Sequence, residues 1–204
     1  MTQNNNTRNR IMYHFDYLTL VLAGALDAQA QVANRAYNIL RKKREVSFRR
    51  PEFLKDLKKY GAIKLYEIIN RQYYSDVTTL LYEPRNTIHD AAFTTLSYKR
   101  AGEPEISLVS APDSIASMLQ DATEQLGSAG QWGLSTGRLE VLLEPYSYAT
   151  SLVCESFKLI DAIAAATDVA HLFPKSYAIP PLKEKPPSNP PFDEHTRERL
   201  VVLG

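Results

Sequence analysis

The sequence predicts an all-α fold with a minor two-stranded antiparallel β ribbon, and three observations support this prediction. Apolar residues recur every three or four positions in most segments, which is the spacing of helices with one buried face. Two short segments, near residues 106 and 140, depart from this spacing and are typical of strands. Prolines cluster after residue 173, where they favour an extended chain over a further helix.

We expect one helical domain at residues 11–173, between a disordered N-terminus at residues 1–10 and a proline-rich extended tail at residues 174–204. The polar, asparagine-rich start lacks the apolar core of a signal peptide, and no apolar run approaches the roughly 18 residues of a membrane span. The single cysteine, Cys154, argues against a disulfide framework and a thiol metal cluster. The chain is therefore expected to be cytoplasmic and to make no membrane contact.

Residues 13–44 predict one long helix that forms the backbone of the fold. Its apolar residues recur at threes and fours, namely Phe15, Leu18, Val21, Leu22, Ala25, Ala28, Val32, Ala36 and Ile39. The segment contains no proline, and Gly24 is its one weak position. Pro51 then breaks the helical pattern and starts a shorter helix that continues through Leu57.

Two further helices are expected at residues 63–70 and 76–82, and a proline then marks the start of another. Proline fixes its own backbone angle near the helical value and lacks the N–H that a first turn leaves unpaired. Pro84 is therefore interpreted as the first helical residue, with Glu83 before it. Apolar residues continue at helical spacing, so this helix is expected to end near Tyr98.

The second half of the chain contains the two predicted strands. Residues 106–109 and 139–143 are rich in valine, leucine and isoleucine and are expected to pair as one antiparallel ribbon. A ribbon of two strands is only marginally stable in water, so we expect it to pack against helices. Helices are predicted at residues 112–126 and 145–169, each opened by a proline.

The segment after Pro84 holds the residues with the clearest chemistry. Arg85 and His89 are four positions apart, which places them about 40° apart around a helix and about 6 Å apart along it. Arginine grips phosphate through two parallel hydrogen bonds, and histidine both takes and gives protons near neutral pH. This pair therefore predicts a phosphate site, to which the N–H groups at the start of the helix would contribute.

The charge balance limits how the chain could bind a nucleic acid. Lysine and arginine total 24 against 23 aspartate and glutamate, so any contact with RNA must be local. Six cations fall within ten positions and could guide an RNA backbone, with Phe48 as a stacking face: Arg41, Lys42, Lys43, Arg44, Arg49 and Arg50. The alternative is a solvated helix end, where cations complement the helix dipole. Tyrosines such as Tyr82 are expected in the core rather than at a stacking surface.

The order of these features resembles the HEPN superfamily of small all-helical proteins over roughly residues 13–98. The resemblance rests on the long first helix, the Arg-Arg-Pro-x-Phe-Leu segment at residues 49–54 and Arg-Asn-Thr-Ile-His at residues 85–89. Residues 132–134, the second predicted strand and the Glu-Pro-Tyr helix start at residues 144–146 look like the second half of uncharacterised bacterial HEPN-like proteins. The chain departs from the superfamily in having three residues between the arginine and the histidine, where a longer spacing is common.

The resemblance implies a HEPN-like helical bundle and a metal-independent endoribonuclease, of the kind found in toxin–antitoxin and phage-defence systems. The catalytic residues would be Arg85, His89 and Asn86, without a metal or other cofactor. An RNA 2′-hydroxyl would attack the adjacent phosphate, with His89 as general base or acid and Arg85 stabilising the growing negative charge. Asn86 would orient either the scissile phosphate or the arginine. Because one histidine cannot easily fill both proton roles, a homodimer with two His89 side chains across a cleft is implied, and an antitoxin protein would be a further partner.

A different reading of the same residues is a non-catalytic helical module that binds a partner or a nucleotide. In that case Arg85 and His89 would pair with Glu83 or Asp90 as structural contacts, and the proline-rich tail would dock to another protein. Geometry separates the two interpretations. An exposed His89 beside Arg85 in a groove favours the enzyme, and a buried His89 hydrogen-bonded to a backbone carbonyl favours the module.

Overall fold

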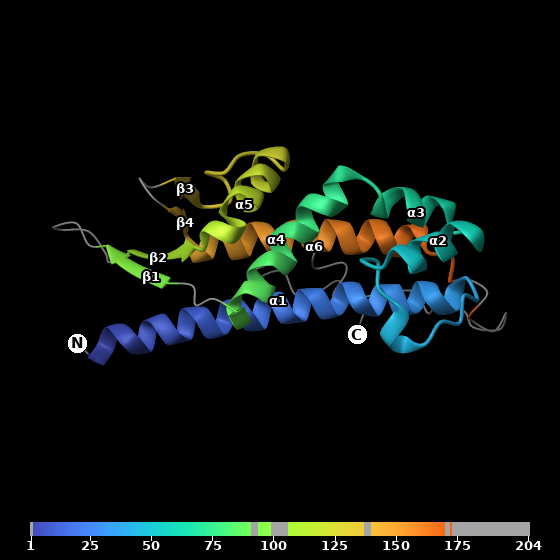
Figure 1. Cartoon of the computed structure of the whole chain (residues 1–204), viewed down its shortest axis with the longest axis horizontal. Helices are drawn as coiled ribbons and strands as arrows, with labels where there is room; N and C mark the ends of the chain where they lie inside the picture. The colour runs from blue at the N-terminus through green and yellow to red at the C-terminus, as the bar shows by residue number, and fades with distance from the viewer. Residues whose placement is uncertain (1, 91–93, 99–105, 137–139, 170–171, 173–204) are drawn as a thin grey trace, which may run out of the picture. The chain divides into compact units, whose positions relative to one another are not determined.

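The structure is a computed structural model that describes residues 2–90, 94–98, 106–136, 140–169 and 172 (Figure 1). The chain divides into two units, Met1–Asp168 and Val169–Gly204, and nearly all of the described residues belong to the first. This first unit is mostly helical and carries a small antiparallel sheet, as the sequence predicts. The proline-rich segment 174–204 lies outside the described residues.

Three long helices lie side by side and contribute much of the core (Figure 1). They are α1 (Thr2–Ala36), α4 (Gln72–Asp90) and α6 (Pro145–Ala166). Fully buried leucines lie on each of these helices, because apolar residues at a period near 3.6 form one continuous face. The shorter helices are α2 (Pro51–Lys59), α3 (Ile63–Ile69) and α5 (Asp113–Gln125), with one turn of 3₁₀-helix, η1 (Lys43–Glu45). In the part of the chain that the structure describes, no helix combines the length and the apolar character needed to cross a bilayer.

The first helix ends at Ala36, well before the predicted end near Arg44. Asn38 and Leu40 both adopt the left-handed backbone conformation, with φ of 53° and 59°, which stops an α-helix. The buried side chain of Asn34 fixes the turn, since its Oδ1 accepts from the backbone N–H of Arg41 at 3.0 Å and its Nδ2 donates to the Arg41 carbonyl at 3.1 Å. The basic run therefore lies on a folded connection and not at a solvated helix end.

Pro84 does not start a helix, contrary to the prediction. It lies buried inside α4, which begins at Gln72 and runs to Asp90. A proline inside a helix leaves the carbonyl four residues earlier without its N–H partner. Here that carbonyl belongs to Leu80, and the hydroxyl of Tyr148 from α6 donates to it at 2.7 Å. The hydrogen bond that Pro84 cannot make is thus replaced by one from a side chain far away in the sequence. This replacement allows the helix to continue past the proline, although local sequence rules predict a break there.

The sheet has four strands in the described residues, not two. They are β1 (Thr94–Tyr98), β2 (Ile106–Ala111), β3 (Leu134–Thr136) and β4 (Val141–Leu143), in the antiparallel order β1-β2-β4-β3. The predicted pairing is confirmed, since β2 lies beside β4 with Val109 opposite Leu143. The prediction that a helix continues to Tyr98 is wrong, because the threonine-rich segment of β1 has strand propensity and covers the open edge of β2.

The start of α6 is fixed by one glycine and one carboxylate. Gly133 has a φ of +69°, and a Cβ at this position would lie 2.9 Å from the Cβ of Ser147. Its carbonyl accepts from the N–H of Glu144 at 2.8 Å. The Glu144 side chain caps the helix by accepting from the N–H groups of Tyr146 at 2.9 Å and Ser147 at 2.7 Å. Trp132, which precedes the glycine, is thereby held in the core against Tyr148.

We expect Glu144→Gln to destabilise the protein by about 1 kcal/mol at neutral pH, because the cap loses its charge. Burial raises the pKa of this carboxyl group, but the hydrogen bonds from Ser147 and Tyr146 outweigh burial and hold the pKa of Glu144 below its ordinary value of 4.5. A lowered folded-state pKa stabilises the protein above the unfolded value, and this contribution is lost as the pH falls through the folded value. The two proteins should therefore converge in urea-unfolding free energy as the pH falls below the folded-state pKa of Glu144, and a constant difference at every pH would contradict the role of charge.

Candidate nucleic-acid interface

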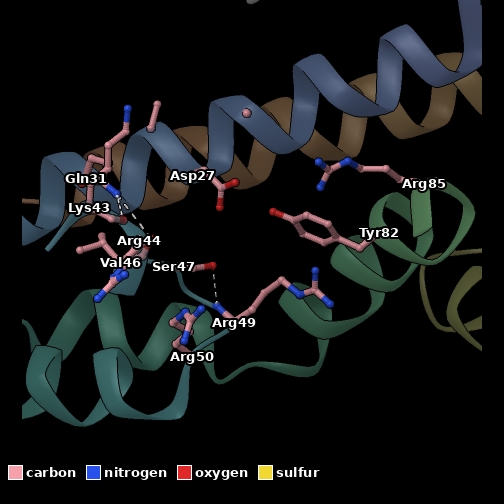
Figure 2. Close-up of a pocket in the computed structure, with 12 residues that line it drawn as sticks. Asp27, Gln31, Lys43, Arg44, Val46, Ser47, Arg49, Arg50, Tyr82 and Arg85 are labelled. Atoms are coloured by element: carbon pink, nitrogen blue, oxygen red, sulfur yellow. Dashed lines mark hydrogen bonds between the residues drawn. The ribbon is translucent and has the colours of Figure 1, made fainter. Parts of the chain in front are cut away.

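A groove of about 1060 Å³ lies between α1, the connection that follows it and α4 (Figure 2). The connection contributes Lys43, Arg44, Arg49 and Arg50, and α4 contributes Arg85. The remaining lining residues are Gly24, Asp27, Ala28, Gln31, Val46, Ser47 and Tyr82. Five basic side chains from segments that are far apart in sequence thus line one concave surface, which is the arrangement that attracts a polyanion.

The fold of the connection explains why its cations reach this groove. Gln31 on α1 donates from its Nε2 to the carbonyl of Lys43 at 3.0 Å, which ties η1 to the helix. Val46 and Phe48 then bury their side chains in the core, so the residues between and after them remain at the surface. The exposed side chains of Arg49 and Arg50 follow this anchor directly. Apolar anchoring therefore positions the basic residues.

Tyr82 is the second residue of α4 that lines the groove, beside Arg85. The guanidinium carbon of Arg49 lies 4.3 Å from the centroid of the Tyr82 ring, within the range of a cation–π contact. Burial and, to a smaller extent, the charge of Asp27 raise the pKa of Tyr82 to about 12, although Arg49 and Arg85 act in the opposite direction. The hydroxyl therefore keeps its proton at neutral pH and remains a hydrogen-bond donor.

Asp27 is the one acidic residue among those that line this groove. It lies on the exposed face of α1, and Figure 2 shows the hydroxyl of Tyr82 pointing toward it. Within the described ranges, the ion pairs are Arg41 with Asp56 and Lys158 with Glu155. The Asp27 carboxylate and the five groove cations therefore make no ion pair with one another or with other described residues.

Four of the six basic residues predicted to bind RNA line the groove, and two do not. Arg41 forms an ion pair with Asp56, and the hydrogen bond to this carboxylate raises the pKa of Arg41 above its ordinary value. Lys42 is exposed outside the lining. The structure therefore brings together Lys43, Arg44, Arg49 and Arg50 and excludes Arg41, whose charge is already neutralised.

The predicted catalytic residues lie at the carboxyl-terminal part of α4. Arg85 is half-buried and lines the groove, whereas Asn86 is exposed and does not line it. Position 89 follows Arg85 by one helical turn, so both positions share a face of α4. The side chain of His89 lies outside the described residues.

Sequence reasoning missed the residues of α1 that form the opposite wall. Gly24 was seen only as a weak helix position, although a Cβ built on it meets no atom within 4 Å, so its side of the groove is open. Asp27 carried no signal of its own, because an acidic residue on an exposed helix face is ordinary. Tyr82 is buried, as the sequence predicts, and it also lines the groove.

The chemistry that these residues support is the binding of anions and of hydrogen-bonding groups close to them. Among the described residues, no group of three or more histidines, cysteines, aspartates or glutamates is placed to hold a metal ion.

No protein-family model, curated protein or solved structure matches the chain.

Proposed function

We propose that the groove binds the phosphate backbone of RNA and that the protein is a HEPN-like, metal-independent endoribonuclease, acting as a toxin or a phage-defence component. The observation that supports this proposal most directly is the gathering of Lys43, Arg44, Arg49 and Arg50 in one groove with Arg85. A single-stranded RNA presents one phosphate per nucleotide, so several cations along a groove can each contact a different phosphate.

The proposed reaction uses the end of the groove at α4. The 2′-oxygen of the RNA attacks the adjacent phosphorus, the bond to the 5′-oxygen breaks, and a 2′,3′-cyclic phosphate remains. Arg85 stabilises the negative charge that grows on the phosphoryl oxygens. His89 takes the proton from the 2′-hydroxyl or gives a proton to the 5′-oxygen, and in a homodimer the two copies of His89 divide these roles. Asn86 contacts the RNA next to the scissile phosphate.

A non-catalytic module that binds RNA or a nucleotide is the second candidate, and one observation favours it. The predicted phosphate site included free N–H groups at a helix start, but Pro84 lies inside α4 and no helix begins there. Near Arg85, a phosphate could then be bound by side chains alone, without backbone N–H groups from a helix start. This arrangement is sufficient for binding and offers less stabilisation to a transition state than a helix start would.

Incubation of the full chain with a labelled RNA in the presence of a chelator tests the proposal. We expect cleavage to products that end in a 2′,3′-cyclic phosphate and loss of this cleavage in His89→Ala. His14→Ala is the matched control, because His14 is an exposed histidine on α1 outside the groove. Equal cleavage by the natural chain and His89→Ala would remove the catalytic role of His89. RNA binding without cleavage would support the non-catalytic module instead.

A further inference from the structure

An acidic residue in a groove for RNA requires an explanation of its own. Asp27 lies among five cations, and a phosphate placed beside its carboxylate would be repelled. The part of a ligand that faces Asp27 must therefore carry hydrogen-bond donors and no negative charge. In RNA these donors belong to the bases and to the 2′-hydroxyl groups.

We propose that Asp27 and Tyr82 form a base-reading site that selects guanine in the RNA strand whose phosphates occupy the basic side of the groove. This inference rests on the proposed binding of RNA, and it adds a sequence preference to it. It requires no cleavage, so it holds for an enzyme and for a non-catalytic module alike.

The hydrogen-bonding groups of the two residues match one base. The hydroxyl of Tyr82 is a donor, and the carboxylate of Asp27 offers two acceptor oxygens. The Watson–Crick edge of guanine presents one acceptor, O6, beside two donors, the N1–H and the N2 amino group. Adenine, cytosine and uracil each present a single donor group on this edge, so they leave one carboxylate oxygen unpaired. A desolvated oxygen without a partner weakens binding, and guanine is therefore favoured.

The walls of the groove leave room for a planar base between α1 and Arg49. Gly24 and Ala28 present at most a methyl group toward the groove, and the space beside Gly24 is open. Tyr82 covers one face of the Arg49 guanidinium, and the opposite face can stack on a base because Arg49 is an exposed side chain. Tyr82 is too buried for its ring to serve as a stacking platform, and recognition is therefore assigned to its hydroxyl, which points toward Asp27 in the groove (Figure 2).

The test measures the affinity of the full chain for uridine dodecamers that carry one central guanosine, inosine, adenosine or uridine, by fluorescence anisotropy. We expect the guanosine oligomer to bind roughly tenfold more tightly than the uridine oligomer, with inosine between them because it lacks the N2 amino group. In Asp27→Asn this preference should disappear, because the amide turns one acceptor into a donor. Tyr82→Phe should reduce it, and Asp121→Asn, which removes an exposed charge from α5, should retain it.

The outcomes separate the two proposals. Equal affinity for all four oligomers, or a guanosine preference that survives in Asp27→Asn, would overturn base reading by Asp27 and leave the binding of RNA intact. Failure of the natural chain to bind any of the oligomers would overturn the proposed function and the guanine site together. A tighter complex with adenosine than with guanosine would also overturn the assignment, because adenine lacks the second donor.

Discussion

A variant in which Lys43, Arg44 and Arg50 are replaced by alanine is expected to bind single-stranded RNA roughly a thousandfold more weakly than the natural chain at low salt. Each lost charge-assisted contact with a phosphate removes about 1.5 kcal/mol or more. These three side chains line the groove and are exposed, so their removal leaves the core intact. Arg49 is kept in this variant because its contact with Tyr82 is part of the structure of the groove wall.

The salt dependence of binding distinguishes loss of phosphate contacts from a general loss of charge. The slope of log affinity against log salt should fall by about 2, since each phosphate contact with single-stranded RNA contributes about 0.7 to it. Replacement of Lys55, Lys64 and Arg71 by alanine is the matched control, because these exposed cations on α2, at the start of α3 and after it lie outside the groove. A similar loss in both variants would show that the net charge of the chain, and not the groove, governs binding.

The apolar periodicity of the sequence was sufficient to predict most of the helices and the pairing of β2 with β4. Helical spacing and strand alternation are local properties that survive in the folded chain. The proline rule failed at Pro84, because its outcome depends on whether another segment can satisfy the carbonyl of Leu80. That partner, Tyr148, lies on α6, too far along the sequence for a rule based on neighbouring residues to include it. The prediction of a helix up to Tyr98 failed for a similar reason, since the adjacent strand β2 offers a partner to that segment.

The groove could be predicted only in part. Its basic residues form a pattern in the sequence, whereas the position of α1 opposite them depends on the tertiary structure. The cluster of cations is plain in the sequence, and Arg85 was singled out by its spacing from His89. Their convergence depends on the turn around Asn34, which sends the connection back along α1 toward α4. No sequence pattern indicated that Asp27 would lie opposite these residues. Charge predicts what a groove would attract, whereas tertiary structure decides which side chains share it.

We expect Tyr148→Ala to destabilise the protein by about 3 to 5 kcal/mol, since it empties a large volume in the core. Tyr148 is fully buried, and its ring contacts those of Phe15 and Trp132, with centroids 5.6 Å and 5.8 Å away. Burial raises the pKa of Tyr148 well above its ordinary value, so its hydroxyl remains a donor to the carbonyl of Leu80. Urea unfolding followed by circular dichroism measures the loss.

Tyr148→Phe isolates the hydrogen bond from the packing of the ring. It should cost about 1 to 3 kcal/mol, because the buried carbonyl of Leu80 is left without a donor. In a Pro84→Ala background the alanine N–H can donate to that carbonyl, so the same substitution should cost clearly less. The coupling between Tyr148 and Pro84 is therefore the quantity that tests whether the hydroxyl compensates for the proline.

Tyr37→Phe provides the matched control for this double-mutant cycle. Its hydroxyl donates to the carbonyl of Ala166 at 3.0 Å, at the other end of α6 and away from Pro84. The cost of Tyr37→Phe should therefore be the same with proline or alanine at position 84, because distant sites contribute independently. If Tyr148→Phe also costs the same in both backgrounds, the carbonyl of Leu80 does not depend on Tyr148. The continuity of α4 through Pro84, and with it the position of Arg85 in the groove, would then need a different cause.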